Sequence, residues 1–306
     1  MFLNGISKNY NIDLLSDDIS IHSGIPKKFY YLKDKNFDDW EIPPWELYIF
    51  KDRLLGEGSF SKVYLAKWRE TFVVAKIIDS NFLSIKKEIV MREIDIMSKL
   101  HHPNIVQFLG YIDDPFTIVL EYIPSGDLTT NMRNLNKKQK ISIMKDILKG
   151  LAYIHNRRPN NLIHRDIKPT NILLTNSKVA KIADFGLSKF YNINKINSFE
   201  NIVDFDDEKK TLLQFTDNTI PVGTERYMAP EVKNSFNYDN KIDIYSCGIL
   251  LYELFEGNKF FPEKKMHWYY TPKIIRNIIT NYMLCQEPNE RSDALSILKM
   301  LNNSNT

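Results

Sequence analysis

The chain has 306 residues, 43% of them hydrophobic, and its 41 Lys and Arg residues nearly balance 38 Asp and Glu residues to give a net charge of +3. This length can bury a large core, and no block of like charge predicts a nucleic-acid-binding arm or a polybasic membrane anchor. The two cysteines, Cys247 and Cys285, fit neither a zinc-ligand spacing nor a disulfide framework, so we expect a reducing compartment and a cytoplasmic location.

Residues 1–46 predict an extension without an independent fold. They mix Asn, Asp, Lys and Ser with scattered aromatic residues, and Pro43-Pro44 indicates an extended segment near their end. The first residues lack a basic stretch followed by a long apolar run, and no part of the chain approaches eighteen consecutive apolar residues. We therefore expect neither a secretory signal nor a membrane-spanning helix.

Short apolar runs begin after this extension, with a glycine turn between the first two. They are Leu47 to Phe50, Val63 to Ala66 and Phe72 to Ala75. This pattern is typical of antiparallel strands joined by short turns. Apolar residues at helical spacing over 86–100 then predict one helix, so this part of the chain is β-rich with a single helix.

The second half of the chain is predicted to be mainly helical. Long periodic segments cover 138–155 and 243–255, and Ser292 or Asp293 is suited to cap a final helix that ends near Leu301. The stretch 191–221 is rich in Asn, Asp and Lys without strong periodicity, and it predicts a loop. A β-rich part followed by a mainly α-helical part gives an α+β protein.

Two features of the first half have both an ordinary and a functional interpretation. The turn Gly56-Glu57-Gly58-Ser59-Phe60-Ser61 lies between two predicted strands, where a glycine hairpin brings backbone N–H groups close to phosphates. Two glycines in a hairpin are nevertheless more often only a turn. Lys76 follows the third strand, and a lysine in such a place is usually solvent-exposed. Neither feature decides the function alone.

The most informative segment is His164-Arg165-Asp166-Ile167-Lys168-Pro169-Thr170-Asn171, which Asp184-Phe185-Gly186 follows. Phosphoryl transfer from ATP needs a carboxylate that orients a hydroxyl and accepts its proton, and it needs oxygen ligands for Mg²⁺. Asp166 fits the first requirement, and Asn171 with Asp184 fits the second. This pattern favours phosphoryl transfer, because an accidental run of these residue types at this spacing is improbable.

These motifs resemble those of the eukaryotic protein kinase family, which has the patterns H-R-D-x-x-x-x-N and D-F-G. Val74-Ala75-Lys76, Ala229-Pro230-Glu231 and Arg291 follow the family's order as well. The resemblance implies a bilobal protein kinase fold over 47–301, with a small β-rich N-lobe and a mainly α-helical C-lobe. Lys168 is typical of serine/threonine kinases, and the lead-in Trp40-Glu41-Ile42 is similar to the tyrosine-kinase-like group.

The resemblance also implies a role for individual residues. Asp166 would orient the acceptor hydroxyl, Lys168 would neutralise the transferring phosphoryl group, and Asn171 with Asp184 would hold Mg²⁺. Lys76 would contact the α- and β-phosphates while paired with Glu93, with Glu88 as the competing partner. ATP would lie between the lobes, and the residues implied to contact it are Leu55, Gly56, Glu57, Gly58, Ser59, Phe60, Ser61, Val63, Ala75, Lys76, Glu121, Ile123, Asp127 and Leu173.

Other residues are implied to support the site. Glu231 would form a buried ion pair with Arg291, Asp243 would hold the backbone of the catalytic loop, and Thr224 would contact that loop. We hypothesise that a phosphate on Thr219 or Thr216 orders the long loop by pairing with Arg165. His164 is expected to pack and form hydrogen bonds rather than to titrate.

We therefore predict an ATP- and Mg²⁺-dependent serine/threonine kinase that acts on protein substrates and has no nucleic-acid or membrane partner. One alternative is a pseudokinase scaffold, which is favoured by Ser61 at the position of the family's third glycine and by the short region 256–290. Retention of Lys76, Asp166, Asn171 and Asp184 opposes it. A second alternative is a small-molecule phosphotransferase, which the Ala-Pro-Glu segment opposes. The oligomeric state is not predicted.

Overall fold

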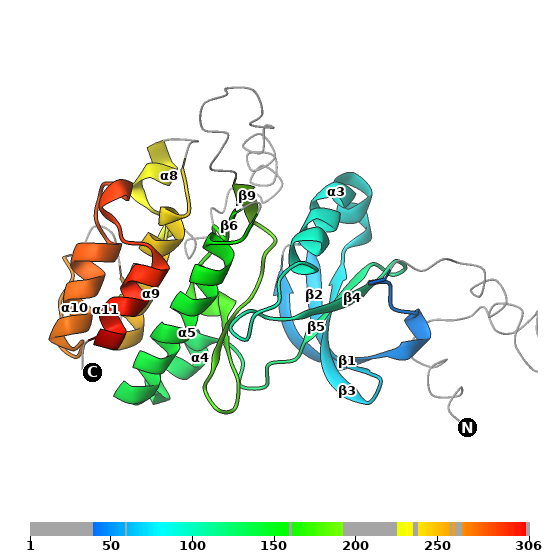
Figure 1. Cartoon of the computed structure of the whole chain (residues 1–306). Coiled ribbons are helices and arrows are strands. Elements are labelled where there is room, and N and C mark those ends of the chain that lie inside the picture. Colours follow the sequence, from blue (N-terminus) through cyan, green and yellow to red (C-terminus); the bar gives the residue numbers. More distant parts are fainter. Residues whose placement is uncertain are drawn as a thin grey trace, which may run out of the picture. The chain divides into compact units, whose positions relative to one another are not determined.

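The computed structural model describes residues 39–58, 60–158, 161–191, 225–234, 238–257, 259–260 and 265–303. The chain divides into two compact units, and Figure 1 shows the elements of each. The first unit contains the residues up to Ser98 together with Gln107–Tyr122. The second contains Lys99–Val106 and the residues from Ile123 onward. A β-rich unit and a helical unit agree with the predicted fold class.

The first unit is built on a sheet of five antiparallel strands in the order β1-β2-β3-β5-β4. The three predicted strands are confirmed, and each is longer than its apolar run because backbone pairing continues into the polar flanks. The elements of this unit are the 3₁₀ turn η1 (Pro44–Glu46), β1 (Leu47–Gly58), β2 (Ser61–Trp68), β3 (Thr71–Ile78), α3 (Ser80–Met97), β4 (Phe108–Ile112) and β5 (Thr117–Glu121).

The sheet also includes residues from the predicted extension. The Ile42 N–H donates to the Tyr111 carbonyl at 2.7 Å, and the Tyr111 N–H donates to the Trp40 carbonyl at 2.9 Å. Gly110 permits this close approach, because a Cβ atom there would lie 2.6 Å from the Trp40 oxygen. The segment 40–42 therefore pairs with β4, and Ile42 packs into the core of the first unit.

Helix α3 begins six residues before the predicted position of Lys86. Asp79 is its N-cap, and its carboxylate accepts the N–H groups of Asn81 at 2.9 Å and Phe82 at 3.1 Å. This cap satisfies backbone donors that a helix leaves unpaired at its start. The cap fixes where the helix starts and therefore where Glu93 lies along it.

The second unit is mainly helical, and its short strands form two two-stranded sheets, β6-β9 and β7-β8. Helix α5 contacts both α9 and α11 (Figure 1). The elements are α4 (Leu128–Asn131), η2 (Met132–Asn134), α5 (Lys137–His155), β6 (Asn161–Ile163), η3 (Pro169–Asn171), β7 (Ile172–Leu174), β8 (Ala180–Ile182), β9 (Lys189–Tyr191), α8 (Pro230–Asn234), α9 (Lys241–Glu256), α10 (Lys273–Ile278), the π-helical turn η5 (Ile279–Met283), η6 (Pro288–Glu290) and α11 (Ala294–Asn303).

The helices predicted in the second half are confirmed within a few residues. Asn136 caps α5 and forms a capping box with Gln139. Of the two candidates for the last cap, Asp293 accepts the Ser296 N–H at 2.8 Å. Helix α9 is buried on all sides and ends at Gly257, which has a φ of 73°. None of the described helices is both long enough and apolar enough to cross a membrane.

Candidate active site

Lys76 and Glu93 form an ion pair within the first unit. The Lys76 Nζ lies 2.7 Å from the Glu93 Oε1, and the two side chains are 18% and 10% exposed. Strand β3 supplies the lysine and helix α3 supplies the glutamate. The predicted pairing with Glu93 rather than Glu88 is confirmed. The ion pair holds the Lys76 ammonium group in a fixed position, as contact with phosphate oxygens requires.

Strand β3 places Ala75 and Lys76 on opposite faces of the sheet. Ala75 has no exposed surface and packs in the core with Leu47, Ala66 and Val119. Because side chains alternate along a strand, the residue on the same face as Lys76 is Val74. The side chain of Ala75 is therefore buried in the core and has no surface to offer a nucleotide, contrary to the prediction.

The glycine turn forms the hairpin between β1 and β2, in which Gly58 pairs with Ser61 and Gly56 with Val63. Ser59 lies outside the described residues. The Phe60 ring stacks on the ring of Phe82 with centroids 4.2 Å apart, and the Phe60 carbonyl accepts the Asp79 N–H at 2.9 Å. The hairpin is thus attached to the first turn of α3. Glu57 faces solvent and pairs with Lys62 at 3.2 Å, and Leu55 is 47% exposed.

The residues predicted to contact adenine and ribose have other contacts as well. The Glu121 N–H donates to the Gln107 carbonyl at 3.0 Å, and its carboxylate accepts the Gln107 N–H at 2.7 Å. Asp127 is the N-cap of α4 and accepts the Thr130 N–H at 2.9 Å. Asp127 also forms an isolated β-bridge with Leu173 of β7. Ile123, another predicted contact of the nucleotide, is buried. One Asp127 oxygen is therefore already used by the helix.

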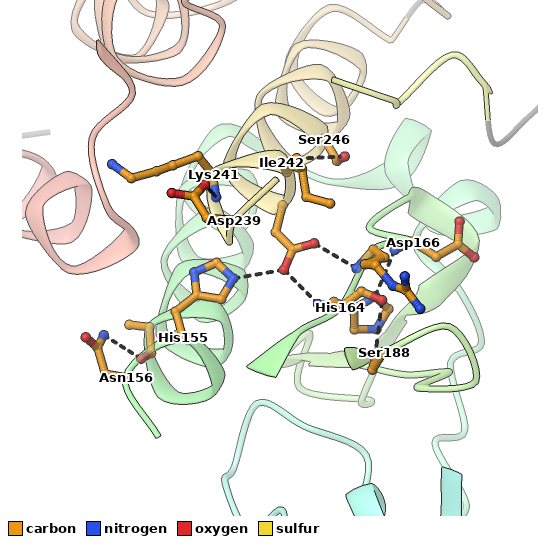
Figure 2. A network of polar contacts seen from close by, with 12 residues as sticks. His155, Asn156, His164, Asp166, Ser188, Asp239, Lys241, Ile242 and Ser246 are labelled. Atoms are coloured by element: carbon orange, nitrogen blue, oxygen red, sulfur yellow. Dashed lines mark hydrogen bonds and ion pairs between the residues drawn. The ribbon is translucent and has the colours of Figure 1, made fainter. Parts of the chain in front are cut away.

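The predicted catalytic loop, residues 164–171, follows β6, and a single buried carboxylate holds the start of its backbone. Asp243 of α9 accepts the N–H groups of His164 and Arg165, each at 2.8 Å, and it contacts the His155 Nε2 at 2.9 Å. Figure 2 shows His155 and His164 on either side of this carboxylate. The predicted role of Asp243 is confirmed, whereas no sequence signal singled out His155.

This network stabilises an unfavourable backbone conformation. Arg165 has a φ of 69°, in the left-handed region that residues with side chains seldom adopt. Such a conformation costs about 1–3 kcal/mol, and it persists where the surroundings fix it. The hydrogen bond from the Arg165 N–H to Asp243 supplies this constraint. Burial raises the pKa of Asp243, but hydrogen bonds from His155 and from the His164 N–H outweigh burial and lower it.

Two side chains of the predicted site, those of Lys168 and Asn171, bind Asp166. The Lys168 Nζ lies 2.7 Å from the Asp166 Oδ2. The Asn171 Nδ2 donates to the same oxygen and to the Asp166 carbonyl, both at 2.9 Å. Asp166 is 8% exposed, and its side chain points away from the network around Asp243 (Figure 2). These contacts leave Oδ1 without a hydrogen-bond partner among the described residues.

Contacts of the preceding residue, Ala183, fix the position of Asp184 in the chain. The Ala183 N–H donates to the Asn171 carbonyl at 2.8 Å, and the Ala183 carbonyl lies 3.1 Å from the His164 Nε2. Phe185 is buried with its ring edge-to-face against His164. Asp184 itself is exposed and has a φ of 64°. His164 therefore packs and forms hydrogen bonds as predicted.

The donor atoms of this region suit Mg²⁺. Asn171 uses its amide nitrogen to bind Asp166, so its Oδ1 is the atom left to face a cation. Asp184 adds an exposed carboxylate. Magnesium prefers one or two protein oxygen ligands completed by water and phosphate oxygens. The predicted pair, Asn171 and Asp184, fits this requirement.

A hollow next to Asp166 faces the segment around the Ala-Pro-Glu motif. Its lining includes Arg165, Asp166, Tyr227, Met228 and Ala229. The segment is held by side chains of α9, because the Tyr227 hydroxyl donates to Glu253 at 2.7 Å and the Ser246 hydroxyl donates to the Tyr227 carbonyl at 2.7 Å. Asp166, the candidate base, and the segment 227–229 thus line one hollow within the second unit.

The predicted ion pair between Glu231 and Arg291 is confirmed. The two guanidinium Nη atoms donate to the two carboxylate oxygens at 2.6 and 2.9 Å. Arg291 is 1% exposed, and its remaining donors bind backbone carbonyls of Lys241, Cys285 and Gln286. This pair fixes α8 and the motif that it contains.

Arg165 binds the Leu187 carbonyl and the Tyr238 hydroxyl, the latter at 3.2 Å. The loop was predicted over 191–221, and its first residue, Tyr191, is the last residue of β9. The rest of that loop lies outside the described residues, as do Thr216, Thr219 and Thr224. The pairing of Arg165 with a loop phosphate stays a hypothesis.

Comparison with known proteins gives an independent result. A family model described as "Protein kinase domain" matches residues 49–305. The chain is 38% identical to serine/threonine-protein kinase VIK of Arabidopsis thaliana over 233 residues, which cover 73% of this chain and 49% of that protein. It is 34% identical to serine/threonine-protein kinase CTR1 of the same plant, over 71% of this chain and 25% of that protein.

A third relative is a putative serine/threonine-protein kinase/receptor, R826, of Acanthamoeba polyphaga mimivirus. It is 33% identical over 76% of this chain and 13% of its own length. The chain thus spans about half or less of the length of these relatives.

Proposed function

Because the chain belongs to the protein kinase family, we propose that it transfers the γ-phosphoryl group of ATP to serine or threonine hydroxyls of protein substrates. The observation that carries this proposal is the arrangement at Asp166, where Lys168 and Asn171 both bind one carboxylate oxygen. The other oxygen is then oriented to accept a proton from an acceptor hydroxyl. The names of the relatives support serine and threonine as acceptors.

Asp166 acts as the base in this proposal. The acceptor oxygen attacks the γ-phosphorus, the bond from that phosphorus to the β–γ bridging oxygen breaks, and ADP leaves with the bond's electron pair. The hydroxyl proton passes to the Asp166 Oδ1. Lys168 binds the same carboxylate and places its positive charge beside the transferring group, where charge stabilisation lowers the barrier.

Other predicted site residues bind the nucleotide and its metal ion in this proposal. Lys76, which Glu93 holds in position, binds the α- and β-phosphates. Val74 lies on the same face of β3 as Lys76, where its side chain would contact the adenine ring. Asn171 and Asp184 would hold Mg²⁺, which would spread the charge of the triphosphate. The exposed Asp184 carboxylate and the oriented Asn171 amide support this assignment.

A protein-phosphorylation assay tests the proposal. The full chain is incubated with ATP, Mg²⁺ and a basic protein substrate, and the modified residues are identified by mass spectrometry. We expect phosphoserine and phosphothreonine with the unmutated protein and none with Asp184→Ala. Asp52→Ala, which removes an exposed carboxylate of the first unit, should retain activity. Nucleotide binding without phosphorylation by the unmutated protein would instead support the scaffold alternative.

A further inference from the structure

The segment 265–272 connects the region after α9 to α10, and it exposes two adjacent tyrosine rings. We call this segment the aromatic strap. Tyr269 is 73% exposed and Tyr270 is 74% exposed, and their ring centroids lie 6.4 Å apart. Ile274, two residues beyond the strap, is 44% exposed. Tyrosine is enriched at protein interfaces, and contiguous exposed apolar surface is typical of interaction sites.

The strap is anchored firmly at its C-terminal end by one carboxylate. Glu256, the last residue of α9, is 4% exposed and accepts the N–H groups of Tyr269 at 2.9 Å, Tyr270 at 3.2 Å and Thr271 at 2.9 Å, together with the Thr271 hydroxyl. Burial raises the pKa of Glu256, but these hydrogen bonds outweigh burial and lower it, so the carboxylate stays charged. The backbone of the exposed tyrosines is therefore fixed while their rings face solvent.

A second anchor lies one helical turn earlier on α9. The Tyr252 hydroxyl donates to the His267 carbonyl at 3.2 Å, and the Tyr252 ring packs edge-to-face against Trp268 at 5.0 Å. The Arg276 guanidinium of α10 lies 5.8 Å from the Trp268 ring centroid. Trp268 thus ties the strap to α9 and α10. A surface fixed in this way loses little conformational entropy on binding, which favours affinity.

The exposed charged residues of the strap and of the stretch that follows it are all positive. Residues 265–286 contain no Asp or Glu, although Asp and Glu make up 38 of the 306 residues of the chain. Within this stretch Lys265, Lys273 and Arg276 are all exposed. A partner that covers the two tyrosines therefore meets positive charge and no acidic side chain of this stretch.

We propose that the aromatic strap is a docking surface for an acidic segment of the protein substrate, one that presents an apolar side chain to Tyr269 and Tyr270 and carboxylates to Lys265, Lys273 and Arg276. This inference rests on the proposed kinase function, because it names the class of substrate. Tyrosine and arginine are enriched among the residues that carry most of the binding energy at protein interfaces. Opposite charge adds specificity and faster association.

Fluorescence anisotropy with the full chain, without ATP, tests the docking directly. The probe is a labelled synthetic peptide in which Glu alternates with Leu and Phe, and the control peptide carries Gln in place of each Glu. We expect the acidic peptide to bind at least about tenfold more tightly than the control. The doubly substituted protein with Tyr269→Ala and Tyr270→Ala should lose about tenfold in affinity, and Lys273→Glu should lose a similar factor at low salt.

Matched controls show whether the surface is specific. Phe72→Ala removes an aromatic ring that is 53% exposed on β3, and Lys51→Glu reverses an exposed charge on β1. Both should leave peptide affinity unchanged. Equal binding of the acidic and neutral peptides would overturn the proposal. Tighter binding of oligouridine, lost in the same tyrosine variant, would overturn it in favour of a nucleic-acid partner.

A kinetic experiment connects docking to catalysis. The same acceptor peptide is compared with and without the acidic segment attached. The tyrosine substitutions should raise KM for the extended peptide and leave kcat, and all parameters for the short peptide, unchanged. If neither peptide is phosphorylated but the acidic peptide still binds at the strap, the kinase function fails and the docking surface stands. Unchanged KM for the extended peptide in the variant would contradict a role in substrate recruitment.

Discussion

Arg291 illustrates, at the scale of single residues, how a buried charge becomes part of the fold. It is 1% exposed, its two Nη atoms bind both oxygens of Glu231, and it also binds three backbone carbonyls. Desolvation of such an ion pair offsets much of its attraction, so the pair contributes less to stability than its geometry alone implies. Removal of only one partner is costly, because the other charge is left buried and unpaired.

We therefore predict that Glu231→Ala lowers the free energy of unfolding by about 3–5 kcal/mol. Urea denaturation measures this change. Lys87→Ala, which breaks an exposed pair with Asp113, is the matched control and should have no measurable effect. Joint replacement of Glu231 by Leu and Arg291 by Met should recover much of the loss. Similar losses in Glu231→Ala and Lys87→Ala would contradict this account.

Asp243 predicts a dependence of stability on pH. Its folded pKa is lowered, because hydrogen bonds from His155 and the His164 N–H outweigh the effect of burial. A carboxylate with a lowered pKa stabilises the fold above its unfolded pKa of about 4, and this contribution is lost as the pH falls through the folded pKa. Asp243→Asn should therefore be less stable than the unmutated protein at pH 6, and the difference should shrink below about pH 4.

Urea unfolding at a series of pH values measures this difference. Asp52→Asn changes an exposed carboxylate and should give a difference that stays nearly constant with pH. A stability gap for Asp243→Asn that stays constant or widens on acidification would rule out the lowered pKa as a source of stability.

The sequence predicted the individual side chains that belong to fixed motifs, and these include the pairs Lys76–Glu93 and Glu231–Arg291. The sequence also predicted a nucleotide contact for Ala75, but its side chain is buried in the core. Neighbouring residues of a strand point to opposite faces of the sheet, and it is Val74 that shares a face with Lys76. Sequence reasoning also missed His155 and Phe82, which belong to no recognised motif, although their partners Asp243 and Phe60 were singled out.

Helix α3 shows a corresponding error at the scale of elements. Helical periodicity indicated a start near Lys86, whereas the helix begins at Ser80 because Asp79 caps it. The capping residue was visible in the sequence, and Phe82 and Ile85 continue the apolar helical spacing back from Ile89, so the sequence held the signal for the earlier start. The position of this start matters because the first turn of α3 contains Phe82, which stacks on Phe60 of the glycine hairpin.

We predict that this stack couples the hairpin to α3. Phe82→Ala should weaken ATP binding by about two- to tenfold, as loss of an aromatic contact worth about 0.5–1.5 kcal/mol implies. Hydrogen exchange in the first turn of α3 should become faster. Calorimetry and exchange mass spectrometry measure the two effects. Phe72→Ala removes an exposed ring of the same sheet and is the control; equal effects of the two substitutions would argue against a specific coupling.

At the scale of the whole molecule, the chain has a β-rich unit and a helical unit, and the family match covers residues 49–305. The sequence predicted this division because alternation and helical spacing change sharply along the chain. It did not predict that residues 40–42 join the sheet, since their pairing depends on the space that Gly110 provides at β4. The chain also spans about half or less of the length of its relatives VIK and CTR1.

The most direct test of the central claim is a single-turnover measurement of phosphoryl transfer from bound ATP to a serine-containing protein, comparing the unmutated chain with Asp166→Asn. We predict that the substitution slows transfer by about a hundredfold or more, as expected for loss of a positioned base, while the affinity for ATP changes little. Equal rates for the two proteins, or no transfer by the unmutated chain despite bound ATP, would contradict the proposed kinase mechanism.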